Sequence, residues 1–154
     1  MLVKLLQDLK VPFVVNQSSY NMLQTAVKDD GLMATLKALD RGLVAYGPLS
    51  EGLLTDRYLD GIPDDFPIHW SNTDIFANGK DAVVKKLNQL NDIAKNRQQT
   101  LAQMALAWIL RDETVSSVII GTTSEKNLLA NIEAGQNLKF SDDEVTAIQT
   151  ILQH

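Results

Sequence analysis

The chain has 154 residues, of which 45% are hydrophobic and 21% charged, so it is long enough for one domain with an ordinary hydrophobic core. Its formal net charge of −5 is spread over mixed acidic and basic positions, which argues against a nucleic-acid-binding surface. It contains no cysteine, so disulfides, thiolate nucleophiles and cysteine zinc sites are excluded. No apolar run approaches the ~18 residues of a membrane helix, and no signal-peptide pattern opens the chain, so we expect a cytoplasmic protein.

The first 45 residues alternate between helical and extended patterns. Apolar positions over residues 3–9 predict a helix that ends before Pro12, and residues 13–16 predict a strand. A second helix is predicted over residues 31–39, followed by a strand over residues 43–45.

A long polar segment covers residues 60–80. It carries Gly61, Pro63, Pro67 and Gly79 among Asp, Asn and Ser, which is typical of loops but long for a compact domain. We expect this segment to be a lid or to be disordered.

The second half of the chain again alternates helices with a strand. Helices are predicted over residues 83–94, over residues 100–109 behind the capping-box pattern Thr100–Gln103, over residues 124–132 behind Ser124, and over residues 141–152 behind Ser141 and Glu144. Between the helices over residues 100–109 and 124–132, the continuous apolar run Val118, Ile119 and Ile120 predicts a strand.

This alternation predicts parallel strands joined by right-handed crossovers. The first two strands are spaced by roughly the ~31 residues per unit of an eight-fold barrel of ~250 residues. Three strands are too few to close such a barrel, so we expect a single α/β unit over residues 1–154 that is part of a (β/α)8 TIM barrel.

Four segments in collinear order resemble the aldo-keto reductases, in particular the branch that contains the potassium-channel β subunits and bacterial glyceraldehyde-phosphate reductases. They are residues 15–21 (VNQSSYN), 46–55 (YGPLSEGLLT), 103–110 (QMALAWIL) and 119–132 (IIGTTSEKNLLANI). The resemblance covers essentially the whole chain and implies that its strands are the sixth, seventh and eighth of the barrel.

The same resemblance implies that the catalytic parts of such an enzyme lie outside this sequence. In the family, the catalytic Asp, Tyr, Lys and His lie on the first four strands, and the Ser-Asn pair that holds the carboxamide follows the fifth. We therefore expect a fragment of an NAD(P)H-dependent oxidoreductase that reduces aldehydes or ketones, inactive alone and able to meet a small carbonyl substrate only in the complete enzyme. A non-catalytic nucleotide-binding or interaction module and a truncated gene product remain as alternatives.

Two strand-end residues are implied to meet the nicotinamide. Gln17 would hydrogen-bond the carboxamide, and Tyr46 would place its ring against the nicotinamide face. On local sequence alone, Gln17 is more typical of a residue that caps a neighbouring loop, and Tyr46 equally fits a core tyrosine at the barrel rim.

The turn after the second strand is implied to hold the pyrophosphate. Its residues Gly47, Pro48, Leu49, Ser50 and Glu51 would act largely through backbone N–H groups, to which Pro48 adds none. Arg57 stands where this branch usually has Lys, and either pairs with a phosphate or lies on a solvated loop.

The turn after the third strand meets a helix N-terminus, which favours an anion. The resemblance implies cofactor contacts from Gly121, Thr123, Asn127 and Asn131, the last two at the adenosine end. Ala130 replaces the usual acidic residue, and the Lys and Arg that grip a 2′-phosphate are missing from positions 121 and 127. Lys126 is a substitute, so NADPH is favoured with NADH as the alternative.

The remaining polar residues give no further site. His69 and His154 stand apart without ligand spacing, so no metal site is expected, and the Trp108 stripe is expected to be core packing. Open strand edges and an uncovered barrel interior predict a homo-oligomer that pairs through the N-terminal helix and residues 13–16. No nucleic-acid or membrane partner is expected.

Overall fold

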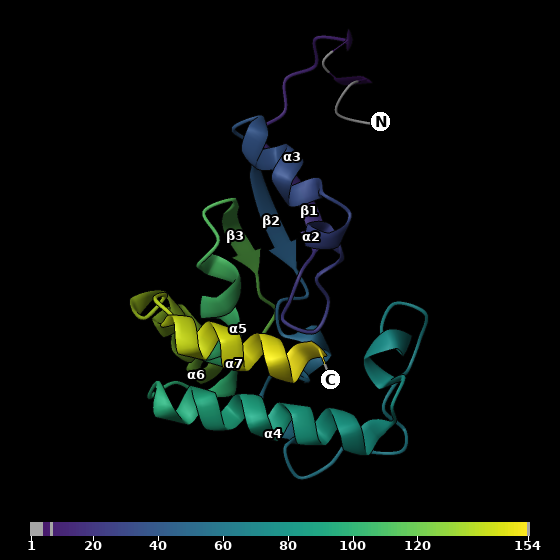
Figure 1. The fold of residues 1–154 in the computed structure, drawn as a ribbon, viewed down its shortest axis with the longest axis vertical. Helices are drawn as coiled ribbons and strands as arrows, with labels where there is room; N and C mark the ends of the chain where they lie inside the picture. Colours follow the sequence, from purple (N-terminus) through teal and green to yellow (C-terminus); the bar gives the residue numbers. More distant parts are fainter. Residues whose placement is uncertain (1–4, 7, 154) are drawn as a thin grey trace.

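The computed structural model describes residues 5–6 and 8–153, and a parallel three-stranded sheet lies at its centre (Figure 1). Strands β1 (Val15–Ser19), β2 (Gly42–Tyr46) and β3 (Val115–Ile119) are arranged in chain order, with β2 in the middle. Ser19 is paired with Tyr46, and Tyr46 with Ile119. The carboxyl ends of all three strands therefore lie at one edge of the sheet.

The two outer strands are shifted from their predicted positions. The strand expected over residues 13–16 begins at Val15, because pairing starts there opposite Gly42. The strand expected over residues 118–120 begins earlier, at Val115, where pairing with β2 starts. Apolar pattern marks the most hydrophobic part of a strand, whereas the partner strand sets where the ladder begins.

Two short helices connect β1 to β2. α2 (Ala26–Asp29) is separated from α3 (Leu32–Ala38) by Gly31 in a left-handed conformation with φ 79°. The helix predicted over residues 31–39 is α3, while α2 was not predicted, because four residues are too few to show a helical period. Of the predicted N-terminal helix, residues 5, 6 and 8 are helical, and residues 1–4 and 7 lie outside the described residues.

A long connection joins β2 to β3. It contains the 3-10 helices η1 (Ser50–Gly52), η2 (Asp56–Tyr58) and η3 (Thr73–Phe76), then α4 (Lys80–Asn96) and α5 (Leu101–Leu110). The prediction of a lid or a disordered segment over residues 60–80 is wrong, because Ile62, Phe66 and Phe76 are buried there. Their burial against the core holds this loop in place.

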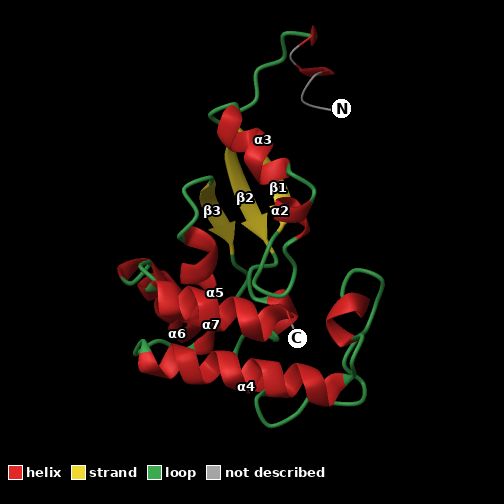
Figure 2. Ribbon diagram, in the orientation of Figure 1, coloured by secondary structure: helices red, strands yellow, loops and turns green. Residues whose placement is uncertain are grey.

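The last part of the chain is helical (Figure 2). α6 (Glu125–Glu133) is followed by the 3-10 helix η4 (Ala134–Gln136) and α7 (Asp142–Gln153). The capping box at Thr100 and the Ser124 cap are present, and Ser141 and Glu144 exchange the same pair of hydrogen bonds. No helix among the described residues combines the length and apolar character needed to cross a membrane.

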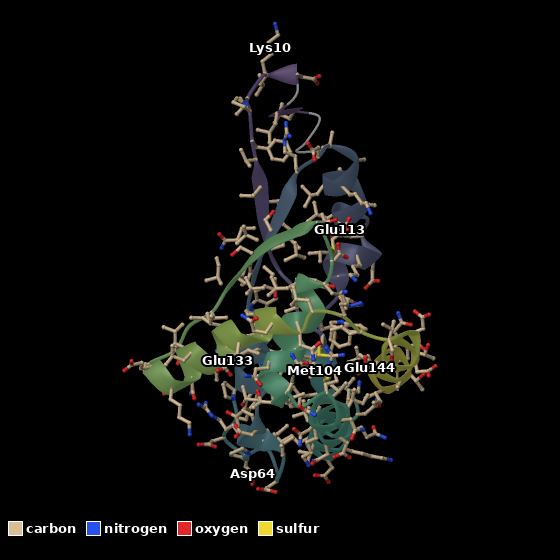
Figure 3. All side chains as sticks on the ribbon, turned by 90° about the vertical axis from the view of Figure 1, so that its left-hand side faces the viewer. Lys10, Asp64, Met104, Glu113, Glu133 and Glu144 are labelled. Carbon is tan, nitrogen blue, oxygen red and sulfur yellow. The ribbon has the colours of Figure 1, made fainter. Side chains whose placement is uncertain are left out.

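The hydrophobic core has two clusters of buried side chains. The larger joins α4, α5 and the 60–80 loop to α7, with Met104 and Trp108 inside it, and Figure 3 shows Met104 among the helices. The smaller cluster covers one face of the sheet through Leu43 and Ala45. α5 belongs to both, because Ile109 packs in the smaller cluster. The predicted role of Trp108 as core is confirmed, with 4% of its surface exposed.

The opposite face of the sheet is open. Side chains alternate along a strand, so Val44 and Tyr46, which follow Leu43 and Ala45, point away from the covering helices. Tyr46 and Ile119, which are paired, are each 47% exposed, and Val15 is 44% exposed. This open face adjoins the edge at which the strands end.

Candidate functional site

Tyr46 ends β2, whereas Gln17, which was predicted to end its strand, lies in the middle of β1. Gln17 is exposed and pairs with Val44, which puts it on the same face of the sheet as Tyr46. Tyr46 is 47% exposed, so it is not part of the core of the described residues. Gln17 makes no side-chain hydrogen bond to another described residue, so its amide does not cap a neighbouring loop.

The turn that follows β2 has an unusual backbone. Gly47, Ser50 and Glu51 have φ values of 62°, 48° and 56°, in the left-handed region. The Ser50 N–H donates to the Gly47 carbonyl and the Gly52 N–H to that of Leu49, both at 3.0 Å. The N–H groups of Leu49 and Glu51 have no partner among the described residues. Successive N–H groups in such a turn form an anion-binding concavity.

The side chains of this turn leave the backbone accessible. Pro48 and Ser50 are buried, Leu49 is half-buried, and Gly47 is exposed. A Cβ built on Gly47 would come no closer than 3.8 Å to Ser19 Oγ, so only the conformation requires glycine there. Glu51 is therefore the only residue of the turn over residues 47–51 with an exposed side chain.

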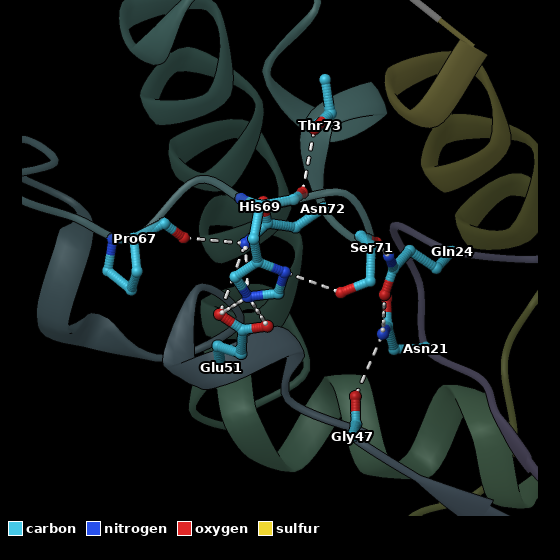
Figure 4. A network of polar contacts seen from close by, with 9 residues as sticks. All are labelled: Asn21, Gln24, Gly47, Glu51, Pro67, His69, Ser71, Asn72 and Thr73. Carbon is cyan, nitrogen blue, oxygen red and sulfur yellow. Dashed lines mark hydrogen bonds and ion pairs between the residues drawn. The ribbon is translucent and has the colours of Figure 1, made fainter.

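A buried asparagine ties the turn to the end of β1. Asn21, 1% exposed, donates from Nδ2 to the Gly47 carbonyl at 3.0 Å and to Gln24 Oε1 at 3.1 Å (Figure 4). Gln24 in turn donates to the Ser71 carbonyl. In the sequence, only the resemblance of residues 15–21 to the family marks Asn21.

A second group of contacts joins the turn to the 60–80 loop (Figure 4). His69 Nε2 lies 3.1 Å from Glu51 Oε1, and Asn72 Nδ2 donates to Glu51 Oε2 at 3.4 Å and to the Pro67 carbonyl at 3.0 Å. His69 therefore has a partner in the fold, Glu51, although the sequence around it shows no ligand spacing. These contacts turn the Glu51 carboxylate toward the loop, which removes a negative charge from the mouth of the turn.

Arg57 lies beside the same turn. A Cβ built on Gly52 would be 3.8 Å from Arg57 Nη1, and the guanidinium carbon is 5.9 Å from the Tyr58 ring centroid. Arg57 is exposed and is not paired with a carboxylate among the described residues. Its charge is thus available to an anion held at the turn.

The turn after β3 leads into the N-terminus of α6. Ser124 Oγ accepts from the Asn127 N–H at 3.3 Å, and the Thr122 hydroxyl accepts from the Ser124 N–H at 3.1 Å. The N–H groups of Glu125 and Lys126, in the first helical turn, have no partner within the described part of the chain. The helix dipole adds positive character at this end.

The other predicted residues of this segment lie on or next to α6. Gly121, Thr123 and Asn127 are exposed, and Asn131 is half-buried one helical turn after Asn127, on the same helix face. Gln103 holds α6 in place by donating to the Ala130 carbonyl at 2.9 Å. Because β2 and β3 are adjacent and parallel, the turns after them lie at the same edge.

These features fit a dinucleotide. The two turns with free N–H groups and the exposed Arg57 can bind a pyrophosphate, and the exposed Tyr46 at the end of β2 can stack on an aromatic ring. Residues 5–6 and 8–153 contain no cluster of three or more His, Asp or Glu side chains arranged to hold a metal ion.

Comparison with known proteins gives the family. The model of the aldo/keto reductase family matches residues 1–153. The L-glyceraldehyde 3-phosphate reductase of Escherichia coli K12 is 39% identical over 151 residues, which are 96% of this chain and 44% of that protein. A probable voltage-gated potassium channel subunit beta of Oryza sativa is 31% identical over 144 residues, 91% of this chain and 44% of that protein.

Solved structures share the fold at lower sequence identity. The glycerol dehydrogenase of Gluconobacter oxydans superposes with a TM-score of 0.79 at 18% identity. The superposition covers 97% of this chain and 45% of the dehydrogenase chain. The holo form of a Bacillus halodurans aldo-keto reductase gives a TM-score of 0.73 at 19% identity, over 97% and 46%. The chain thus spans less than half the length of these relatives. Because the family model matches residues 1–153, the chain belongs to the aldo/keto reductase family.

Proposed function

We propose that residues 1–154 form the cofactor-binding half of an aldo-keto reductase barrel, with β1, β2 and β3 as its sixth, seventh and eighth strands. The whole enzyme reduces an aldehyde or ketone with a nicotinamide cofactor. The observation that carries the proposal is the pair of N–H-rich turns that follow β2 and β3 at one edge of the sheet. The names of the relatives, a reductase and a dehydrogenase, support the reaction class.

Each end of the cofactor has its own set of residues in this proposal. Gln17 binds the carboxamide, and Tyr46 stacks on one nicotinamide face so that the other faces the substrate. The turn over residues 47–51 and Arg57 hold the pyrophosphate.

The adenosine end falls to the turn after β3. Gly121 and Thr123 lie at the mouth of α6, and Asn127 and Asn131 face the nucleoside from the helix. Lys126 is the nearest cation for a 2′-phosphate, which favours NADPH over NADH. The cofactor supplies a hydride when bound, while these residues orient it.

The acid–base chemistry comes from outside this half. Reduction of a carbonyl needs a general acid to protonate the oxygen, and the family resemblance assigns that role to strands that this sequence does not contain. We therefore expect the 154-residue chain to bind the cofactor without oxidising it.

A ligand titration tests the cofactor site. NADPH fluorescence is titrated with the chain and with Gly121→Val, Lys126→Ala and the matched control Gly135→Val. No atom lies within 4 Å of a Cβ at either glycine, so both variants fit the fold. We expect Gly121→Val to weaken binding more than Lys126→Ala, because it blocks backbone approach, and Gly135→Val to have no effect. Equal losses in all three variants would refute the site, as would steady aldehyde-dependent NADPH oxidation by the chain alone.

Exposed apolar side chains outside the proposed cofactor site favour a second function, self-association. Val14 is 76% exposed, and Leu129 and Ile132 of α6 are 57% and 61% exposed. Apolar surface of this extent favours a second chain, and about 1,600 Å² of buried area is enough for a stable dimer. Light scattering should give at least twice the chain mass of 17.0 kDa, and Val14→Lys should lower it. A folded monomer at high micromolar concentration would contradict this.

A further inference from the structure

A separate cavity lies on the helix-covered side of the sheet. It has a volume of about 560 Å³ and opens between α2, η3, the first half of α4 and the ends of α5 and α7. Tyr20, Trp108 and Arg111 line it, and none of them belongs to the proposed cofactor site. The volume is within the ~300–1,000 Å³ range of pockets that take small molecules.

Arg111 is fixed in this cavity without a polar partner. Its guanidinium carbon lies 3.3 Å from the ring centroid of Trp108, and its Nε is buried and makes no hydrogen bond within the described chain. Burial lowers the pKa of Arg111, although Tyr20 and Asp112 oppose that change. A stacked guanidinium with unused N–H groups can donate two parallel hydrogen bonds to a planar carboxylate, as the two prongs of a fork.

Tyr20 gives a second, independent indication. Its side chain is fully buried, and its hydroxyl has no hydrogen-bond partner among the described residues. A buried hydroxyl left without a partner costs about 1–3 kcal/mol. Lys28 Nζ lies 5.5 Å from the centroid of the Tyr20 ring, so a second cation stands at the same wall.

The other charges of the cavity are partly engaged. Lys28 pairs with Asp112 at 3.7 Å, Lys86 donates to the Leu152 carbonyl at 3.4 Å, and Asp29 accepts from the Thr25 hydroxyl at 3.1 Å. The guanidinium of Arg111 is the cation of the cavity without such a contact. Asp74 also lines the cavity and adds a negative charge there, so one unengaged fork suits a monoanion better than a multiply charged phosphate.

One part of the wall is apolar, where Met22, Ile75 and Val83 lie beside the Trp108 ring. The rest is polar and is lined by Asn78, Gln149 and Gln153. We propose that this cavity binds a small monocarboxylate with an apolar body, whose carboxylate pairs with Arg111 beside the Tyr20 hydroxyl. The apolar body lies against the Trp108 wall. The site is distinct from the cofactor site, because Tyr20 packs in the cluster beneath the sheet, and Gln17 lies on the open face.

Benzoate is a suitable probe, with benzamide as its neutral counterpart of the same shape. Titrations are followed by the indole N–H signal of Trp108 in ¹⁵N-labelled chain, and Trp70→Phe assigns that signal by removing the other tryptophan. Trp70 is 92% exposed, so this change does not disturb the core. We expect benzoate to shift the Trp108 signal with saturation, benzamide to shift it at least tenfold more weakly, and inorganic phosphate to leave it unchanged.

Variants locate the contact. Arg111→Gln should weaken benzoate binding at least tenfold, and Tyr20→Phe about threefold. Arg41→Gln is the matched control, because Arg41 is exposed, faces the ring of Phe13 at 5.7 Å and does not line the cavity. If Arg111→Gln does not fold, the comparison of benzoate with benzamide on the unaltered chain decides the question. Equal shifts by these two probes, or an Arg111→Gln variant that binds like Arg41→Gln, would overturn the proposal. No nucleotide is present, so the result is independent of the cofactor proposal.

Discussion

Arg97 fastens the end of α4 to the segment that leads into α7. It is 9% exposed, and its guanidinium donates to the carbonyls of Asn137 and Lys139 at 3.1 and 3.0 Å and to Glu144 Oε2 at 2.8 Å. The guanidinium carbon also lies 3.6 Å from the centroid of the Phe140 ring. Substitution of Arg97 by alanine therefore removes these four interactions, together with the 2.8 Å hydrogen bond from Arg97 Nε to Gln99 Oε1.

The structure sets the size of the expected loss. The carboxylate left behind, Glu144, is 28% exposed, so water reaches it. The lost hydrogen bond to this charged group costs about 1.5–3 kcal/mol, and each carbonyl left unpaired costs about 1 kcal/mol if water does not reach it. Desolvation of the arginine, which the variant avoids, offsets part of this. We expect Arg97→Ala to lower the free energy of unfolding by about 4 kcal/mol, a large share of the ~5–15 kcal/mol of a typical domain.

Urea unfolding followed by circular dichroism measures the loss. With a denaturant dependence of about 2 kcal/mol per molar urea, the midpoint should fall by about 2 M. Arg97→Lys keeps the charge but not the fork, so its midpoint should fall about half as far. Arg41→Ala, at an exposed arginine, is the control. If Arg97→Ala shifts the midpoint no further than Arg41→Ala, the interpretation of Arg97 as an anchor is refuted.

Three further predictions concern single side chains. Burial would raise the pKa of Glu144, but hydrogen bonds from Ser141 and Arg97 outweigh burial and lower the pKa below its ordinary 4.5. The free energy of unfolding should therefore fall as the pH drops through the folded-state pKa of Glu144. Glu144→Gln should remove this contribution from urea midpoints measured between about pH 6 and pH 3. Thr100→Ala, which removes the acceptor of the Gln103 N–H at 3.1 Å, should cost about 1 kcal/mol in the same assay, and no change would contradict the capping role. Gly47→Ala should destabilise the chain by about 1 kcal/mol because φ is 62° there, and a neutral result would show that the turn relaxes.

The helices of the second half were predictable because their signals are local. Apolar period and capping residues lie within a few positions of each other, and the Thr100 and Ser141 boxes form as their spacing predicts. The first and last residues of a strand depend on a partner strand elsewhere in the chain. The apolar pattern alone therefore did not predict that β1 begins at Val15 and β3 at Val115.

The site was predictable where it uses backbone at strand ends. The contacts that shape it were not: Asn21 reaches Gly47 across 26 positions, and Asn72 reaches Glu51 across 21. An asparagine or histidine in a polar loop has the same appearance in sequence whether it holds a distant turn or faces water.

The position of α5 in both core clusters has a consequence for the way the chain opens. Met104 and Trp108 anchor one side of this helix, and Ile109 anchors the other. Neither layer can separate from α5 without exposing fully buried side chains, so the amide protons of α5 should exchange with deuterium only when the whole chain unfolds. Amides of β1, at the sheet edge, should exchange earlier through local fraying. The helix that is buried in both layers thus sets the slowest motion of the molecule.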